Sequence, residues 1–180
     1  MDYQNLEKMQ RSRHSNYKRT FPRFSMCLSK RSGVLNQLVG IGTRNGRRSY
    51  IFNQVYLALV YLKELTKCSS SVELLEGAVR VLEPPMECRR TRRSGRPFFI
   101  PSPCRAARRQ SLAIHFLWEG VLQRSRKEQQ DFSWALVVEI MNLMCRTLNE
   151  RRTTYSFVRR IEFLEVVTQY MASAHLLTRF

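Results

Sequence analysis

The sequence is poor in the residues that usually build an active site. Among its 180 residues there are two aspartates, three histidines and seven glycines. Asp131 directly precedes an apolar helical pattern, so we expect it to cap a helix rather than to act in catalysis. The histidines are far apart in the chain, and the segment Gly-Ile-Gly at 40–42 lacks the third glycine and the preceding strand of a phosphate-binding loop. This composition argues against an enzyme, and we expect no catalytic residue, no cofactor and no small-molecule substrate.

Cysteine pairs and long apolar runs are also missing. The five cysteines are odd in number and include no Cys-x-x-Cys pair, which argues against a metal site and against the disulfide framework of a small secreted domain. Cys88 and Cys104 flank an arginine-rich segment. They are either free thiols, which we expect, or a facing pair at the base of a hairpin. No apolar run reaches the roughly 18 residues of a membrane-spanning helix, and we expect no membrane partner. The N-terminus is rich in Arg, Lys and Ser like a mitochondrial presequence, but Asp2 and Glu7 argue against that interpretation.

What the sequence does have is positive charge. Its 31 Lys and Arg outnumber its 14 Asp and Glu, which gives a net charge of +17 and a pI near 10.6. Residues 1–34 contain eight basic and two acidic residues, and residues 84–109 contain eight arginines and one acid, Glu87. A nearly neutral body that carries a basic tail and a basic arm indicates a polyanionic partner, with nucleic acid first and an anionic membrane second.

Apolar periodicity predicts a mainly α fold. Six helices are expected: over 34–41, from Ser49, from the Ser-x-x-Glu capping pattern at Ser70 to Pro84, from Ala106, over 132–148 and after Thr154. The last helix is predicted to bury a stripe made of Phe157, Ile161, Leu164, Val167, Tyr170, Met171 and Ala174. Trp118 and Trp134 fall in helical patterns and are expected in the core.

Between the third and fourth helices the pattern changes to two strands. Residues 86–93 and 98–105 are predicted to be extended around a turn at 94–97, and Pro101 and Pro103 confine the second strand to a sheet edge or a free arm. We therefore predict a bundle of about six helices, spanning 34–180, with an inserted basic β-hairpin at about 86–105. A basic N-terminal arm over 1–33 is expected to be extended and ordered by its partner.

The chemistry of the hairpin follows from its arginines. A guanidinium group forms paired hydrogen bonds with phosphate, and few acids are present to neutralise these side chains. Glu87 is expected to pair with a neighbouring arginine. Of Phe98 and Phe99, which must point to opposite faces of a strand, one is expected to pack on the helical body and the other is free to stack on a base.

At this point the residues resemble a known family. The segment Asn-Gly-Arg-Arg-Ser at 45–49, and Val-Tyr-x-Ala-Leu at 55–59 after it, are similar to a turn and helix of the bacterial-type small-subunit ribosomal protein seven family. Residues 87–117 match the family's hairpin and following helix without a gap, with Gly95 at the tip. The run Arg-Arg-Gln-Ser-Leu-Ala-Ile at 108–114 is close to the mitochondrial branch, whereas the C-terminus diverges from the family pattern.

This resemblance, which covers about residues 34–150, implies a constituent of the small ribosomal subunit. Such a protein binds the 3′ major domain of small-subunit rRNA, organises assembly of the head among neighbouring head proteins, and places its hairpin near the mRNA exit and the exit-site tRNA. We expect a mitochondrial location, with a plastid or the bacterial cytoplasm as alternatives. The runner-up is a non-ribosomal, architectural nucleic-acid-binding protein that uses the same basic hairpin.

The expected RNA-binding residues fall into two groups. By position in the resemblance, the RNA-facing role falls on Arg47, Arg48, Arg89, Arg90, Arg92, Arg93, Arg96, Arg105, Arg108 and Arg109. The basic arm independently fits a segment that threads rRNA, with Arg11, Arg13, Lys18, Arg19, Arg23, Lys30 and Arg31.

Overall fold

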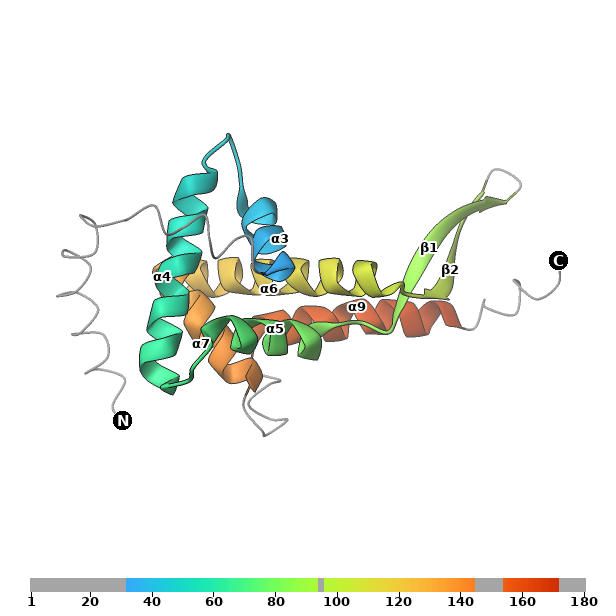
Figure 1. Ribbon diagram of the computed structural model, residues 1–180. Coiled ribbons are helices and arrows are strands. Elements are labelled where there is room, and N and C mark those ends of the chain that lie inside the picture. The colour runs from blue at the N-terminus through green and yellow to red at the C-terminus, as the bar shows by residue number, and fades with distance from the viewer. Residues whose placement is uncertain (1–31, 94–95, 145–153, 172–180) are drawn as a thin grey trace.

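The computed structural model describes residues 32–93, 96–144 and 154–171, without the side chains of residues 93 and 96–98. Within this part of the chain there are six helices and one two-stranded antiparallel sheet, inserted between the third and fourth of these helices as predicted (Figure 1). The elements are, in order, α3 (Gly33–Gly42), α4 (Arg48–Thr66), α5 (Ser71–Leu82), β1 (Met86–Arg93), β2 (Arg96–Pro103), α6 (Ala106–Glu128), α7 (Phe132–Met144) and α9 (Tyr155–Met171).

Several elements begin and end where short sequence signals place them. The Ser70 hydroxyl accepts a hydrogen bond from the backbone N–H of Glu73 at 3.4 Å, which caps α5 as predicted. α5 ends before Pro84, because proline lacks the N–H that would continue the helix. Between α3 and α4, Asn45 and Gly46 adopt positive φ angles of 53° and 72°, which these residue types tolerate better than others.

α6 is the central helix of the body. It has 23 residues, so it is about 34 Å long at 1.5 Å per residue, and it packs against α3, α5, α7 and α9. The core around it consists largely of fully buried aliphatic side chains, each of which stabilises the fold by roughly 1.5–3 kcal/mol relative to exposure. Trp118 is buried in this core with its indole against Gly42, and Trp134 is half-buried against it, as predicted. Fully buried leucines of this core include Leu38, Leu62, Leu82, Leu117 and Leu143.

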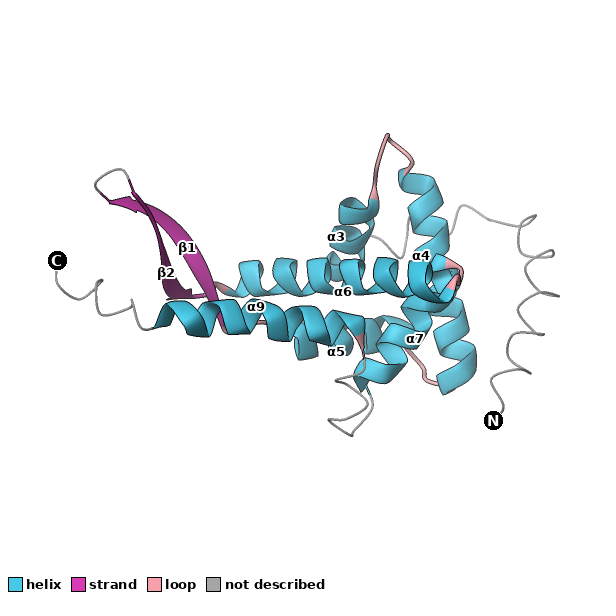
Figure 2. Cartoon of the chain, turned by 180° about the vertical axis from the view of Figure 1, so that it is seen from behind, coloured by secondary structure: helices cyan, strands magenta, loops and turns pink. Residues whose placement is uncertain are grey.

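The last helix, α9, is less buried than its sequence pattern predicted. Val167 is buried, but Met171 is 47% exposed, and Ala174 lies outside the described residues. The remaining members of the stripe are only half-buried, namely Phe157, Ile161, Leu164 and Tyr170. The reason is that α9 lies beside α6 along the edge of the bundle and also supports the hairpin, so only part of its apolar face reaches the core (Figures 1 and 2).

The second strand of the hairpin begins earlier than predicted. β2 spans Arg96–Pro103 rather than 98–105, and Arg93 pairs with Arg96. Pro97, Pro101 and Pro103 are an even number of residues apart, so all three lie at positions whose backbone nitrogen faces away from β1. The prolines therefore remove no hydrogen bond from the ladder, and β2 is an edge strand of the two-stranded sheet, as predicted.

Candidate nucleic-acid interface

The hairpin projects from the end of the body where α6 begins and α9 ends (Figures 1 and 2). The hairpin contacts the helices through the Phe99 ring, which is 37% exposed and packs on Tyr170 of α9 with ring centroids 5.2 Å apart. Pro101 and Cys104 are buried there, and the Cys104 N–H donates to the Pro85 carbonyl at 3.1 Å. Phe99 therefore packs on the body, whereas the side chain of Phe98 lies outside the described part of the chain.

Arginines occupy both faces of β1. Cross-strand partners share a face, so Arg90, opposite Phe99, and Arg92 lie on one face, whereas Arg89 lies on the other face with Glu87. All three arginines are exposed. The arm thus presents positive charge in two directions, which suits contact with phosphates on either side of it.

Glu87 is the acid within this basic segment, and it pairs with arginine as predicted. Its carboxylate accepts hydrogen bonds from Nε of Arg89 at 3.3 Å and from Nε of Arg108 at 3.2 Å. Burial by itself raises the pKa of Glu87, but the hydrogen bonds and charges of Arg108 and Arg89 outweigh it and hold the pKa below its ordinary value. Because one carboxylate serves two guanidinium groups that are 52% and 55% exposed, a net positive charge remains at this point.

The start of α6 adds a second cluster of positive charge beside the hairpin. Arg105 is the N-cap residue, Arg108 lies in the next turn, and both are exposed. Nε of Arg109 donates to the carbonyl of Cys104 at 3.0 Å, which fixes that side chain at the junction with the hairpin. No acid lies in the first turn, where the helix dipole normally favours one. A helix start that carries arginines in place of acids is suited to bind an anion.

A third cluster lies at the start of α4. Arg47 and Arg48 are exposed, and again no acid lies in the first turn of the helix. The turn that holds them and the hairpin both rise on the same side of α6 in Figures 1 and 2. Sequence reasoning missed two exposed neighbours of this turn, Arg44 and Tyr50, because the resemblance began at Asn45 and weighed only the arginines within the motif.

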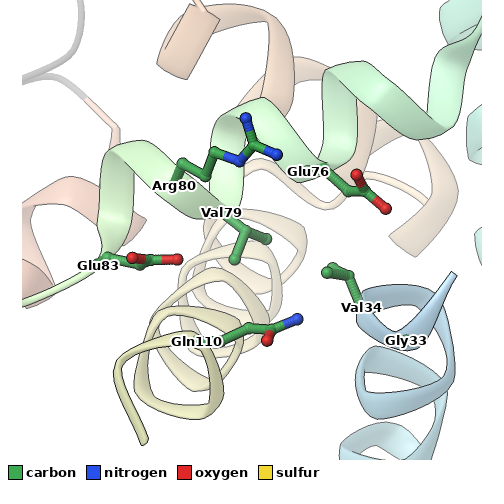
Figure 3. A pocket seen from close by; sticks show the side chains of 7 residues that line it. All are labelled: Gly33, Val34, Glu76, Val79, Arg80, Glu83 and Gln110. Atoms are coloured by element: carbon green, nitrogen blue, oxygen red, sulfur yellow. The ribbon is translucent and has the colours of Figure 1, made fainter. Parts of the chain in front are cut away.

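Two hollows between the described helices have a different character from these clusters. A pocket of about 280 Å³ between α3, α5 and α6 is rimmed by Glu76 and Glu83, with Arg80 between them on α5 (Figure 3). A groove of about 550 Å³ between α4 and α5 also includes Glu76, together with Glu73 and Lys63. Each hollow thus has two carboxylates and one basic side chain, so the surface suited to a polyanion is the projecting arm and the helix starts rather than a pocket.

The described residues offer little chemistry beyond this charge. Cys88 and Cys104 are free thiols, as expected. Burial raises the pKa of both, and at Cys104 the neighbouring Glu87 raises it further, so neither thiol is an activated nucleophile. In the part of the chain that the structure describes, no three His, Cys, Asp or Glu side chains are grouped so that they could hold a metal ion. None of the described helices is long and apolar enough to span a membrane.

Part of the predicted binding set lies outside the described residues. This holds for the whole N-terminal group: Arg11, Arg13, Lys18, Arg19, Arg23, Lys30 and Arg31. Arg93 and Arg96 pair with each other in the strand ladder, but their side chains are outside the description.

Comparison with known proteins matches the chain to one family. The family model described as "Ribosomal protein S7p/S5e" matches residues 3–160. The small ribosomal subunit protein uS7 of Metamycoplasma arthritidis (strain 158L3-1) is 23% identical over 124 residues, which are 69% of this chain and 79% of that protein. The uS7 of Blochmanniella floridana is 28% identical over 100 residues (56% and 64%), and that of Pelotomaculum thermopropionicum is 30% identical over 116 residues (64% and 72%). With the helical body, the inserted hairpin and a family match over most of its length, the chain belongs to the ribosomal protein S7p/S5e family.

Proposed function

We propose that the chain is a structural constituent of the small ribosomal subunit that binds the 3′ major domain of small-subunit rRNA. The observation that carries the proposal is the placement of exposed arginines on both faces of a projecting hairpin, with a single carboxylate among them. Family membership supplies the identity of the polyanion. The described residues proposed to contact RNA are Arg47, Arg48, Arg89, Arg90, Arg92, Arg105, Arg108 and Arg109, with Arg93, Arg96 and the basic arm over 1–33 added from the sequence.

Three features explain how these residues bind RNA. Guanidinium groups on the thin hairpin reach phosphates that a flat protein surface cannot reach, and the apolar contacts at its base keep the hairpin at a fixed angle to the body. The starts of α4 and α6 place the positive end of the helix dipole next to arginines, with no acid in the first turn, which favours phosphate at both points. Each phosphate that is neutralised steepens the salt dependence of binding by roughly 0.7–0.9 in log K against log salt concentration.

The finer assignments extend this proposal. The protein organises assembly of the subunit head, contacts neighbouring head proteins, and holds its hairpin near the mRNA exit and the exit-site tRNA. Its ribosome is mitochondrial, as the likeness of residues 108–114 to that branch of the family supports, with a plastid or the bacterial cytoplasm as the alternatives. The functional division of the chain is a basic arm over 1–33 and a helical domain over 34–180.

Co-sedimentation tests the ribosomal assignment. Tagged chain expressed in its own organism is expected to sediment with small ribosomal subunits and to stay bound after a high-salt wash. Recovery with free DNA and absence from the washed subunits would instead support the architectural nucleic-acid binder.

The role of the hairpin is tested by Arg90→Ala combined with Arg92→Ala. We expect weaker binding to a transcript of the 3′ major domain, a salt slope lower by roughly 1.4–1.8 for two lost phosphate contacts, and an unchanged circular dichroism spectrum. The matched control is Arg80→Ala, which removes an exposed arginine that lies between Glu76 and Glu83 on α5. Equal affinity of the double variant and the native chain would remove the hairpin from the binding mechanism.

A further inference from the structure

Tyr50 is the most exposed of the large apolar side chains in the described part of the chain. It is 61% exposed and is the third residue of α4. The neighbouring arginines Arg44, Arg47 and Arg48 are all exposed as well. Because the Tyr50 ring buries little of its own surface and does not cover the neighbouring arginines, it contributes little to the stability of the fold.

The other four described tyrosines are buried or half-buried, unlike Tyr50, and three of them contact an aromatic ring or a cation. Tyr61 is buried and meets Trp134 edge-on, with ring centroids 6.4 Å apart. Tyr155 is half-buried with the guanidinium of Arg124 over its ring, and Tyr170 supports Phe99 at the base of the hairpin. The exposed ring of Tyr50 is therefore available to a binding partner outside the chain.

Tyr50 and Arg47 lie within one turn of each other at the start of α4. Arg47 is the N-cap residue, its carbonyl accepts a hydrogen bond from the Ile51 N–H at 3.3 Å, and Tyr50 is the third residue of the helix. Arg47 can bind the phosphate of a nucleotide while the Tyr50 ring stacks on its base. A base inside an A-form duplex cannot offer its face in this way, so the nucleotide must be unpaired, in a loop, a bulge or a junction.

We propose that Tyr50 stacks on an unpaired base of the rRNA whose phosphate Arg47 holds. This inference rests on the proposed function. It adds contact with an unpaired base of the RNA to a binding surface whose other proposed contacts are with backbone phosphates. Stacking on an aromatic ring tolerates any base, so Tyr50 recognises that a nucleotide is unpaired rather than which nucleotide it is.

The test compares three variants on a transcript of the 3′ major domain. Tyr50→Leu removes the ring but keeps an apolar side chain, and it is expected to weaken binding roughly 5- to 150-fold, the range that corresponds to one base stack. Tyr50→Phe keeps the ring and is expected to bind within about twofold of the native chain, since a phenyl ring stacks as a phenol does. Leu65→Ala, which shortens a 38% exposed side chain in the last turn of the same helix, is the control and is expected to have no effect.

Salt dependence separates stacking from charge. Tyr50→Leu is expected to lower the affinity by the same factor at every salt concentration, whereas Arg47→Ala is expected to reduce the salt slope by roughly 0.7–0.9. Ultraviolet cross-linking of the complex, followed by trypsin, is expected to place a nucleotide on Tyr50 in the peptide of residues 49–63. If the native chain binds and Tyr50→Leu binds equally well, the stacking inference is wrong and the proposed function stands. If the native chain does not bind the transcript, the proposed function fails first.

Discussion

Glu139 holds three helices together from a fully buried position on α7. The carboxylate accepts hydrogen bonds from Nε of Arg124 on α6 at 3.0 Å, from the Ser156 hydroxyl on α9 at 3.0 Å, and from the Tyr155 backbone N–H at 3.3 Å. Glu139 is 0% exposed, and the Arg124 side chain is 9% exposed. Removal of Glu139 is therefore the perturbation that should test the packing of α9 most directly.

Glu139→Ala leaves a buried cation and two buried donors without their acceptor. Arg124 keeps one carboxylate, Glu128 at 2.6 Å, which lies near the solvent-exposed end of α6. Loss of one partner of a buried ion pair costs roughly 3–5 kcal/mol of unfolding free energy. For a chain of this size each kcal/mol lowers the melting temperature by roughly 2–4 °C, so we expect a decrease of roughly 6–20 °C.

The assays are a thermal melt and urea unfolding of the purified chain, each followed by circular dichroism and by tryptophan fluorescence. Glu139→Gln keeps the shape and one acceptor oxygen, and it should cost less than Glu139→Ala. The double variant Arg124→Met with Glu139→Leu removes both charges and should also cost less than Glu139→Ala alone, because no charge remains buried without a partner. Glu162→Ala is the control, since it breaks an exposed pair with Arg159 and should cost no more than about 1 kcal/mol.

Two results would refute this reasoning. The first is a cost for Glu139→Ala below about 1 kcal/mol, the level of an exposed ion pair, which would mean that the carboxylate is not buried among these partners in solution. The second is a double variant whose cost equals the sum of the costs of Arg124→Met and Glu139→Leu, each measured as a single variant, because uncoupled residues do not share a network.

Three further predictions concern stability. Gly120→Ala should cost about 1–3 kcal/mol, because its Cβ would overlap the Ser156 hydroxyl and lie 2.5 Å from the Ser156 backbone nitrogen, whereas Gly40→Ala, with nothing within 4 Å, should be neutral or stabilising in the same thermal melt. Ser70→Ala should cost about 1 kcal/mol through the lost cap of α5, and an unchanged melting temperature would contradict the capping role. The lowered pKa of Glu87 means that its ion pairs contribute stability above the unfolded value of 4.5, and that this contribution is lost as the pH falls through the lower folded pKa. Glu87→Gln should therefore reduce stability at pH 7 but not at a pH below the folded pKa, and a constant difference in unfolding free energy across this acid range would count against the ion pairs.

Sequence reasoning succeeded for features that depend on residues close together in the chain. Three such features are the cap at Ser70, the helix end before Pro84 and the turn at Asn45-Gly46. Each involves groups within about one helical turn of each other, so a short stretch of sequence is enough to predict it. The exposure of the β1 arginines can also be predicted from a short stretch of sequence, since a strand with so many guanidinium groups cannot be buried on both faces.

Features that depend on distant segments were missed or misplaced. Glu139 interrupts an apolar run, which is a signal for a buried acid, but its partners Arg124 and Ser156 lie 15 and 17 residues away, on other helices. The start of β2 was misplaced because Pro97 fits within a strand only when its backbone nitrogen faces away from β1, and this depends on the register of the two strands. The exposure of Tyr50 depends on what packs near the start of α4, which no local pattern records.

The amino-acid sequence by itself determined the charge of this protein, the order of its helices and strands, and the kind of partner it binds. These follow from side-chain chemistry and from hydrogen bonds between near neighbours in the chain. Only the tertiary structure decided which arginines share a face, that the hairpin and the start of α4 rise on one side of α6, and that Phe99 anchors the hairpin. The reason is physical: burial and facing direction are set by the packing of segments far apart in the chain, and such contacts leave no period or spacing in any one segment.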